Sequence, residues 1–390
     1  MTLRALIPSC RTKKEVIMNP FKFDKLVSPE EFCGRESEIA RLSSLVENKA
    51  NVILYGDRRY GKTSLIQKVF AELPNSILPI YIDIYSIVDE MDFATLLYEA
   101  VEQATPLSLR KQTGKLLEVL SRIEGVNFSP SRSGDSFAMK PSFKTQDFNQ
   151  LLQSAFKLLN SYCEHSDCSH AVIAFDEFQQ VSDIKKVKID AMLRSISQAN
   201  NNVSFIFSGS KKSMLRNLLN APQQPWHGMT TPIALEGIEV ELLQAYCEGK
   251  LDGKFDDFAF KWLYEKLRGQ TRLILQVCFD LYANDIINPN TDDVMGVVDM
   301  ILNEHNADFK EKFLMYSGAT KKALRAISTS SEGGIYSTEN LERHNISSKQ
   351  GLNQSIKALL KADEIQKIDD GQYQFTNVLF GLWLIKEQIK

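Results

Sequence analysis

Short apolar runs alternate with longer amphipathic segments along the first half of the chain. Four of these runs predict buried strands, at residues 51–55, 78–84, 170–175 and 202–207. Three segments predict helices, namely 62–73, which ends before Pro74, and the amphipathic stretches 93–104 and 147–162. Strands that alternate with helices in this way favour an α/β layered domain with a mostly parallel sheet.

The pattern changes after Pro232, where the strand signal fades. Residues 240–303 are nearly all helical in pattern and predict a small helical domain. The remaining chain predicts three helices, at residues 320–328, 337–344 and 347–362. Two short apolar runs, 365–368 and 372–375, then flank Asp369-Asp370-Gly371, and an Asp-Gly turn between such runs indicates a hairpin. Three helices followed by a hairpin make a winged helix-turn-helix.

Two segments fall outside this pattern. Residues 125–142 are rich in Ser, Gly and Pro, and predict either a mobile loop or an irregular hairpin that pairs 126–128 with 137–139. Residues 1–17 carry basic side chains without the apolar core of a signal peptide, and are either an extension before a true start at Met18 or a short disordered tail. The predicted segments are therefore 1–17 (extension), 18–232 (α/β domain), 233–310 (helical lid domain) and 311–390 (winged helix domain).

Composition adds only broad limits. The 390-residue chain is 43% hydrophobic and 24% charged, which is ordinary for a globular protein, and its length fits about two to three domains. No apolar run is long enough to cross a membrane. Six scattered cysteines suit a protein of the reducing cytoplasm, and the net charge of −3 argues against a wholesale polyanion binder.

The junction between the first predicted strand and helix carries the pattern G-x-x-x-x-G-K-[ST]. Glycine permits the turn that points backbone N–H groups at a phosphate, and the helix N-terminus adds a positive dipole end. In this motif Lys62 reaches the β- and γ-phosphates and Thr63 binds Mg²⁺. The strand–loop–helix context favours an ATP site over an ordinary glycine-rich turn. Its candidate residues are Gly56, Asp57, Arg58, Arg59, Tyr60, Gly61, Lys62, Thr63 and Ser64.

An acidic pair follows the strand predicted at 170–175. Ligands of open α/β sheets bind at the carboxyl ends of strands, so Asp176 is a candidate Mg²⁺ ligand and Glu177 a candidate base that deprotonates the attacking water. The alternative is an acidic helix start that complements a helix dipole. After the next strand, Ser208 or Ser210 is a candidate sensor of the γ-phosphate, and we take Ser210 as a candidate catalytic residue; the alternative is a simple strand-end turn.

These motifs resemble those of the archaeal-type ATPase family, which belongs to the STAND class of P-loop NTPases and is related to AAA+ proteins and archaeal replication initiators. The similarity covers nearly the whole chain from Met18. It rests on five segments: the F-x-G-R-E-x-E motif at 32–38, the Walker A segment at 55–65, the Walker B segment at 175–179, the strand end at 207–210 and the closing run at 380–384. The resemblance implies that Gly34 and Arg35 lie beside the adenine. It also implies that the strand at 203–207 lies between the Walker A and Walker B strands.

Two positions depart from the family pattern. A Gly-Arg pair is common after the sensor strand, but residues 226–229 read Trp-His-Gly-Met and lack the arginine. The Gly-x-Pro of the helical domain is replaced by Gly269-Gln270-Thr271, followed by Arg272, which either senses phosphate or is a solvated surface arginine. ATP binding is still expected, but fast turnover is less so, because an arginine finger contributes about 10³ or more in rate.

Two further groups of residues carry candidate chemistry. Cys163, His165, Cys168 and His170 are either a zinc site of unusual spacing or part of a polar loop. The third helix of the predicted winged helix carries side chains suited to duplex DNA, although the domain is also rich in acidic residues, so packing or a protein partner is the alternative. These side chains are Lys349, Gln350, Asn353, Gln354, Lys357 and Lys361.

The sequence thus predicts an α/β P-loop NTPase core with a parallel sheet, a helical lid and a C-terminal winged helix. We expect a Mg²⁺-dependent ATPase whose nucleotide state controls the winged helix. The alternative is a slow ATP-gated switch that acts on a protein partner, or through self-association, with little turnover. A third interpretation, an inactive pseudo-ATPase, predicts no phosphate release.

Overall fold

The structure is a computed structural model that describes most of the chain, in two compact units. The described residues are 18–23, 32–105, 126–133, 136–143, 147–210, 215, 219, 221–330, 334–369 and 372–389. The sheet unit comprises Leu26–Leu243 and Arg268–Arg272, and the helical unit comprises Gln244–Leu267 and Leu273–Lys390 together with residues 18–23. These units divide the chain at other places than the predicted boundaries after residues 232 and 310. The predicted extension at 1–17 lies outside the described residues.

A five-stranded parallel sheet forms the centre of the sheet unit. Its strands are β1 (Asn51–Gly56), β2 (Ile77–Asp83), β5 (His170–Asp176), β6 (Val203–Gly209) and β7 (Thr230–Leu235). They pair in the order β2-β5-β6-β1-β7, and every pairing is parallel. The position of β6 between β1 and β5 confirms the order implied by the family resemblance.

The four predicted strands are confirmed, but the sequence pattern does not predict the fifth. Strand β7 lies at the edge of the sheet beside β1, and its residues alternate between exposed and buried toward its end. It also contains Pro232, which lacks a backbone N–H and is tolerated mainly on edge strands. Because β7 has no continuous apolar run, the sequence pattern does not reveal it. The sheet therefore extends beyond Pro232, where the strand signal fades in the sequence, as far as Leu235.

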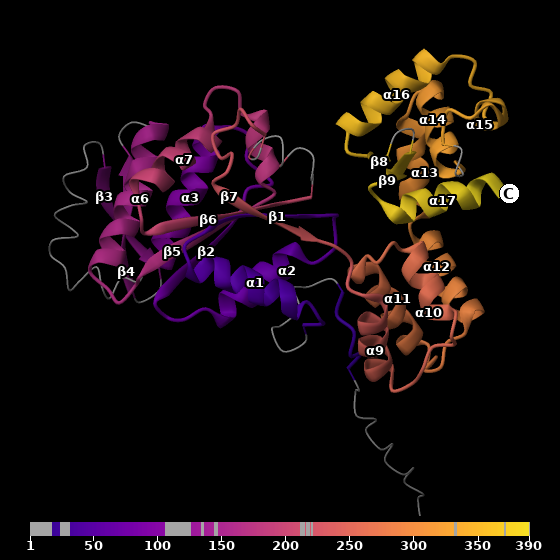
Figure 1. The fold of residues 1–390 in the computed structure, drawn as a ribbon, viewed down its shortest axis with the longest axis horizontal. Coiled ribbons are helices and arrows are strands. Elements are labelled where there is room, and N and C mark those ends of the chain that lie inside the picture. The colour runs from indigo at the N-terminus through magenta and orange to yellow at the C-terminus, as the bar shows by residue number, and fades with distance from the viewer. Residues whose placement is uncertain are drawn as a thin grey trace, which may run out of the picture. The chain divides into compact units, whose positions relative to one another are not determined.

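Helices cover both faces of the sheet (Figure 1). On one face lie α1 (Glu36–Glu47) and α2 (Lys62–Glu72), and on the other lie α3 (Glu90–Ala104), α6 (Phe148–Glu164) and α7 (Ile189–Ala199). Successive residues of a strand point to opposite faces. Val52 and Leu54 of β1 accordingly pack with α1 and α2, whereas Ile53 packs with the core on the other face. These two cores fix the strand ends that carry the candidate site.

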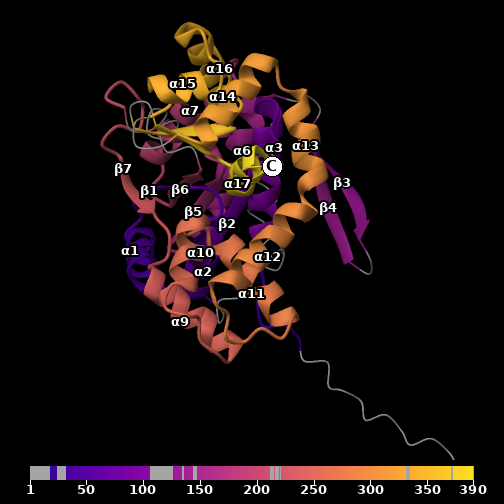
Figure 2. The ribbon, with the colours of Figure 1, turned by 90° about the vertical axis from the view of Figure 1, so that its right-hand side faces the viewer.

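The segment at 126–143 contains an antiparallel hairpin of β3 (Val126–Ser133) and β4 (Ser136–Phe143), which Figure 2 shows as a paired ribbon. The predicted pairing of 126–128 with 137–139 is wrong. Residues 137–139 pair with 130–132, and 126–128 pair with 141–143, because both strands are longer than the two short apolar runs that suggested them.

The helices predicted within 240–303 are confirmed. In chain order they are α9 (Val240–Leu251), α10 (Ala259–Lys266), α11 (Thr271–Ala283) and α12 (Thr291–Glu304), and α13 (Asn306–Met315) follows. No helix in the described part of the chain has both the length and the apolar character needed to cross a membrane.

The last part of the helical unit contains the predicted three helices and hairpin. The helices are α14 (Gly318–Ser328), α15 (Thr338–Arg343) and α16 (Lys349–Lys361), the strands are β8 (Ile365–Asp369) and β9 (Gln372–Phe375), and α17 (Val378–Ile389) follows. Strands β8 and β9 are antiparallel. The turn residues Asp370 and Gly371 lie outside the described residues. A serine caps the start of each of the three helices, namely Ser317, Ser337 and Ser348.

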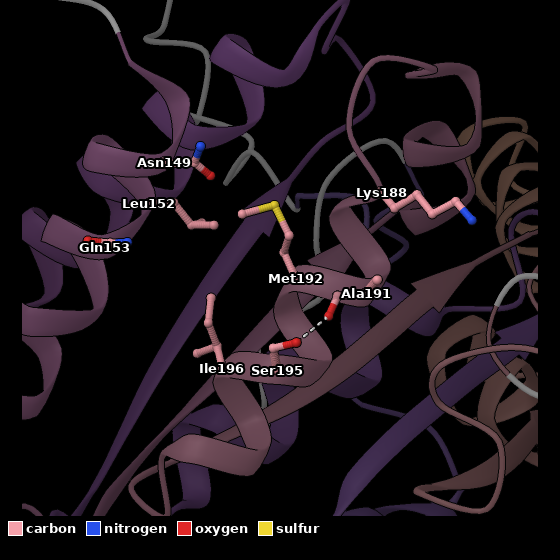
Figure 3. Close-up of a pocket in the computed structure, with 8 residues that line it drawn as sticks. All are labelled: Asn149, Leu152, Gln153, Lys188, Ala191, Met192, Ser195 and Ile196. Atoms are coloured by element: carbon pink, nitrogen blue, oxygen red, sulfur yellow. Dashed lines mark hydrogen bonds between the residues drawn. The ribbon is translucent and has the colours of Figure 1, made fainter.

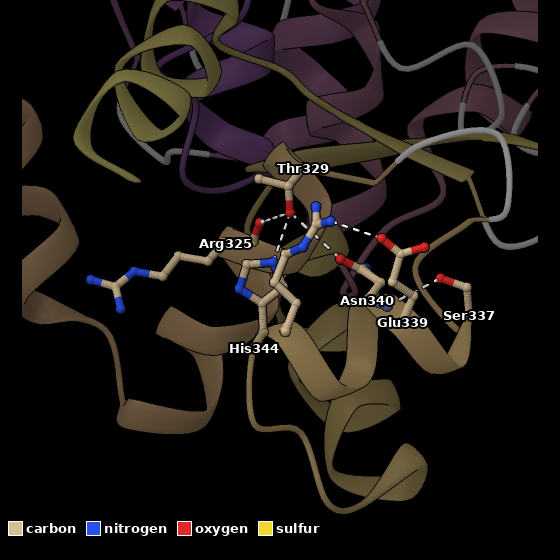
Figure 4. A network of polar contacts seen from close by, with 7 residues as sticks. Arg325, Thr329, Ser337, Glu339, Asn340 and His344 are labelled. Atoms are coloured by element: carbon tan, nitrogen blue, oxygen red, sulfur yellow. Dashed lines mark hydrogen bonds and ion pairs between the residues drawn. The ribbon is translucent and has the colours of Figure 1, made fainter. Parts of the chain in front are cut away.

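A polar network joins the end of α14 to α15 (Figure 4). The hydroxyl of Thr329 lies 2.7 Å from Nε2 of His344 and donates to the carbonyl oxygen of Arg325 at 3.0 Å. The buried amide of Asn340 donates to the carbonyl oxygens of Ala326 and Ile335, at 3.1 and 3.3 Å. Buried backbone carbonyls need such partners, so this network holds α15 to the end of α14.

Candidate functional site

The loop between β1 and α2 is shaped to receive an anion. Gly61, the residue before α2, has a left-handed φ of 84°, and no side chain caps the first turn of the helix. A Cβ added at Gly61 would meet no described atom within 4 Å. Gly56 serves a different purpose, because a Cβ there would collide with the carbonyl of Leu235 on β7. The first turn of α2 therefore has no side-chain cap, and such a helix N-terminus favours a negative ligand.

Lys62, the first residue of α2, is buried beside this loop. Its ammonium group donates hydrogen bonds to the carbonyl oxygens of Gly56 and Asp57, at 2.8 and 2.9 Å. Burial lowers the pKa of Lys62, and the nearby carboxylates of Glu177, Asp176 and Asp57 oppose that shift. The side chain therefore lies between the loop backbone and the acidic strand end, and Ser64 lies half-buried two residues further along α2.

The structure brings Thr63 and Asp176 together from positions 113 residues apart. Thr63 Oγ1 donates to Asp176 Oδ2 at 2.6 Å, and the Tyr81 hydroxyl donates to the same oxygen at 2.8 Å. The backbone N–H of Glu177 donates to Asp176 Oδ1 at 3.0 Å. Burial raises the pKa of the Tyr81 hydroxyl, and the charge of Asp176 raises it further, so Tyr81 remains a hydrogen-bond donor.

Glu177 directly follows β5 and has a left-handed backbone, with φ of 55°. Its carboxylate accepts a hydrogen bond from the amide nitrogen of Gln179, a buried residue of the short 3-10 helix η2 (Phe178–Asp183). Ser210 Oγ donates to the same carboxylate at 3.4 Å. A non-glycine residue in this region costs about 1–3 kcal/mol, and such residues cluster at functional sites.

The two candidate serines differ in their surroundings. Ser208 is completely buried within β6, and its hydroxyl has no hydrogen-bond partner among the described residues. Ser210, one residue beyond the strand, is the one that lies beside Glu177. Gly209 between them approaches η2 closely, because a Cβ at this position would collide with the side-chain amide of Gln179.

Arg35 is buried and its guanidinium group points at the protein backbone. It donates to the carbonyl oxygens of Tyr60 and Glu236, at 2.9 and 2.6 Å, and pairs with Glu38 at 3.2 Å. Arg35 therefore ties the phosphate loop to the chain that follows β7. Gly34, with a left-handed φ of 61°, faces Ile238 on the same segment. A place for Gly34 and Arg35 beside an adenine stays a prediction.

Several arginines surround the loop. The Tyr60 hydroxyl donates to the carbonyl oxygen of Arg268 at 2.8 Å, which holds residues 268–272 against the loop within the sheet unit. Partial desolvation lowers the pKa of Arg59, and the positive charges of Arg272 and Arg58 lower it further. Like charges held this close disfavour one another, and an anion between them would relieve the repulsion.

The sequence pattern predicts no role for Tyr81, and it includes Gln179 only as part of the Walker B segment. Tyr81 lies on β2, two residues before Asp83, which is the register partner of Asp176. Gln179 follows the acidic pair directly, but only the turn of η2 brings its amide back to Glu177. The position of Gln179 beside the acidic pair was a usable signal, whereas the contact of Tyr81 requires the strand order.

A separate open cavity of about 450 Å³ lies between α6 and α7 (Figure 3). Leu152, Met192 and Ile196 give it an apolar lining, and Asn149 and Lys188 lie at its edge. None of its lining residues belongs to the loop or the acidic strand end, so it is distinct from the candidate site.

The parallel sheet, the strand–loop–helix with Lys62 and Thr63, and the neighbouring acidic strand end define a P-loop NTPase of the α/β class. The family of ATPase domains found predominantly in Archaea matches residues 32–238, which is more than half of the chain. The chain belongs to this family, and the predicted resemblance is confirmed.

Solved structures show the same fold. The chain is similar to a Walker-type ATPase of Pyrococcus abyssi, with 17% identity, a TM-score of 0.61, and coverage of 91% of this chain and 97% of that one. It is also similar to the ORC2 protein of Aeropyrum pernix in its ADPNP–ADP complexes, with 13% identity, a TM-score of 0.51, and coverage of 94% and 98%. A comparison with curated proteins found no match.

Proposed function

We propose that this protein binds Mg-ATP in the loop at 56–64 and hydrolyses it to ADP and phosphate. One observation carries the proposal: Thr63 and Asp176 lie 2.6 Å apart, oxygen to oxygen, with Glu177 next in the chain. Hydroxyl and carboxylate oxygens are ligands that suit Mg²⁺. An ordinary glycine-rich turn would not require a hydroxyl and a carboxylate to lie together in this way. Family membership supports the same activity at the general level.

The residues present fit both ATP and Mg²⁺. The uncapped first turn of α2 and the ammonium group of Lys62 would hold the phosphates, and Thr63 and Asp176 would hold the ion. When bound, Mg²⁺ supplies positive charge to the phosphate oxygens. Arg59 and Arg272 would add a second positive side to the site, and the similar ORC2 protein has been solved with the nucleotides ADPNP and ADP.

In this proposal Glu177 orients and deprotonates the attacking water. Its carboxylate is held by the amide of Gln179 and by the hydroxyl of Ser210, so it has a fixed orientation at the strand end. A base needs to be within hydrogen-bond reach of the proton that it takes, and residues that fix its rotamer contribute to that geometry. Ser210 is then a residue that helps to position the base.

The test is phosphate release under steady-state conditions. Wild type should release phosphate from ATP only when Mg²⁺ is present, and Glu177→Gln should bind ATP but lose most of the rate, because proton transfer by a positioned base contributes about 10²–10⁴-fold. Glu47→Gln is the matched control, since Glu47 is an exposed carboxylate at the end of α1. Equal rates for wild type and Glu177→Gln would remove Glu177 from this role.

A second candidate function is duplex DNA binding by a winged helix made of α14–α16 and the hairpin β8–β9. The observation that favours it is the orientation of α16, in which Leu352, Ile356 and Leu359 are buried and the six predicted contact residues are all exposed. Such an arrangement presents one polar face of the third helix to a groove.

Binding to duplex DNA is tested by its salt dependence. The logarithm of the affinity for DNA should fall linearly with the logarithm of the salt concentration. The double variant Lys357→Ala, Lys361→Ala should reduce the slope of this line by about two, since each phosphate contact contributes about 0.9 to it. Lys254→Ala with Lys261→Ala is the matched control, with the same change of charge on exposed lysines. Equal retention of the two double variants would contradict a DNA-contacting α16 and leave a packing or protein-binding role.

The slow ATP-gated switch stays the alternative, and the assignment to the STAND class stays a prediction. It is favoured by residues 226–229, where Trp226 is buried and its indole N–H donates to the carbonyl oxygen of Asp190 at 2.8 Å. Residues 226–229 therefore place a packed tryptophan where the family pattern has a Gly-Arg pair. Tight ATP binding with little phosphate release by wild type would select the switch.

A further inference from the structure

The segment 163–170 places two cysteines in contact. Cys163 lies in the last turn of α6, Cys168 lies just before β5, and their sulfur atoms are 3.4 Å apart. Both are free thiols. A disulfide bond is about 2.05 Å long, so the two sulfur atoms would have to move roughly 1.3 Å closer together. The short segment that connects the helix end to the strand start can provide this movement.

The two histidines of the segment do not complete a metal site with these sulfurs. His170 is buried, with Nε2 at 2.9 Å from the carbonyl oxygen of Val46 and Nδ1 at 3.0 Å from the hydroxyl of Ser169. Nδ1 of His165 lies 2.8 Å from the carbonyl oxygen of Ser161. Among the described residues, no group of three or more potential ligands is arranged to hold a metal ion. The geometry thus favours a thiol pair over the zinc alternative.

The two thiols have unequal environments. Cys163 is buried, with 8% of its surface exposed, whereas Cys168 is partly exposed. The hydrogen bond from Cys163 lowers the pKa of Cys168 to about 7 although burial opposes that shift, and the backbone of Leu78 and the charge of Lys49 assist. The Cys168 sulfur also lies 3.2 Å from the carbonyl oxygen of His170. The same hydrogen bond and burial raise the pKa of Cys163. An accessible thiolate beside a buried partner thiol is the arrangement of peroxide-sensitive cysteine pairs.

We propose that Cys163 and Cys168 form a redox-active dithiol that hydrogen peroxide converts into an intrachain disulfide. This inference is independent of the proposed ATPase activity. The thiolate of Cys168 attacks one peroxide oxygen, the O–O bond breaks, and the other oxygen leaves as hydroxide, which becomes water on protonation. The sulfur of Cys163 then attacks the sulfenic sulfur of Cys168, the S–S bond forms, the S–O bond breaks, and a second water leaves with the Cys163 proton. Two thiols are oxidised by two electrons, and one peroxide is reduced to two waters.

A second pair provides an internal comparison. Cys247 and Cys278 are completely buried in the helical unit, and the pKa of Cys247 is raised by its hydrogen bond to Cys278 and by burial. Thiols that are protonated and inaccessible react slowly with peroxide. The pair in the sheet unit is therefore expected to oxidise first.

The test uses the folded full chain treated with equimolar hydrogen peroxide at pH 7, quenched with an alkylating reagent and digested with trypsin. The peptide 158–185 contains Cys163 and Cys168 and no other cysteine. It should resist alkylation, lose the mass of two hydrogen atoms, and regain both thiols on reduction. Because the pKa of Cys168 is lowered, more of it is thiolate at this pH, so this peptide should be oxidised at lower peroxide doses than the buried pair Cys247 and Cys278.

Two variants separate the roles of the sulfurs. Cys163→Ser should stop at a sulfenic acid on Cys168 that a cyclic 1,3-dione captures, and Cys168→Ser should leave Cys163 unreacted. Cys33→Ser is the control and should behave as wild type. Full alkylation of the wild-type peptide after peroxide treatment would overturn the proposal. So would oxidation of Cys163 at the wild-type rate in Cys168→Ser.

Discussion

Replacing Arg35 should loosen the phosphate loop and destabilise the sheet unit. In Arg35→Ala the carbonyl oxygens of Tyr60 and Glu236 lose their donor, and both bonds come from a guanidinium group with only 3% of its side-chain surface exposed. A hydrogen bond to a charged group contributes about 1.5–3 kcal/mol, and the ion pair with the more exposed Glu38 adds about 0–1 kcal/mol. The two backbone bonds therefore dominate, and the free energy of unfolding should fall by about 3–6 kcal/mol.

Thermal unfolding monitored by circular dichroism measures this loss. For a unit of this size about 1 kcal/mol shifts the midpoint by roughly 2–4 °C, so Arg35→Ala should unfold about 6–24 °C below wild type. The transition to follow is the one that Mg-ATP raises, because ligand binding stabilises the unit that holds the site. ATP affinity should fall as well, since Tyr60 belongs to the loop.

Arg41→Ala is the matched control, because Arg41 is exposed and its bond to the carbonyl oxygen of Pro232 is 3.4 Å long. It should change the free energy of unfolding by no more than about 0.5 kcal/mol. Equal midpoints for Arg35→Ala and Arg41→Ala would refute the structural role of Arg35. It would then be better assigned to a direct contact with nucleotide.

Three further predictions concern the strand ends. Tyr81→Phe removes the 2.8 Å hydrogen bond to Asp176, so half-maximal phosphate release should need about 10-fold more Mg²⁺, and an unchanged Mg²⁺ titration would contradict this role. Gly209→Ala should displace the amide of Gln179 from Glu177, so hydrolysis should fall while ATP binding persists, and wild-type turnover would contradict it. Burial lowers the pKa of His170 below its ordinary 6.5, so the unfolded state takes up more protons below that pH and stability should fall as pH drops through about 6.5. Urea unfolding at pH 7.5 and 5.5 checks this, and a drop just as steep in His170→Asn would assign the effect elsewhere.

Local patterns predicted the elements that carry the chemistry. The candidate residues follow apolar strands directly in the sequence: the loop with Lys62 and Thr63 follows one, and the acidic pair follows another. Such strands are recognisable as buried from their apolar runs, so the positions of the residues at their ends could be predicted. Strand β7 was not predicted, because Pro232 and its half-exposed edge position give no continuous apolar run.

Contacts between distant segments could not be predicted from local patterns. Tyr81 reaches Asp176 only because β2 pairs with β5 in the register that aligns Asp83 with Asp176. Arg35 reaches Glu236 only because the chain after β7 passes beside the phosphate loop. These contacts depend on strand order and register, which the family resemblance supplied only in part.

The most direct test of the central claim is a single-turnover experiment with labelled ATP, Mg²⁺ and excess protein. Wild type and Glu177→Gln should both bind the nucleotide, wild type should convert it to ADP and phosphate, and Glu177→Gln should retain it as intact ATP. Conversion by Glu177→Gln at the wild-type rate would contradict the assignment of Glu177 as the base. A failure of both proteins to bind ATP would contradict the nucleotide site itself.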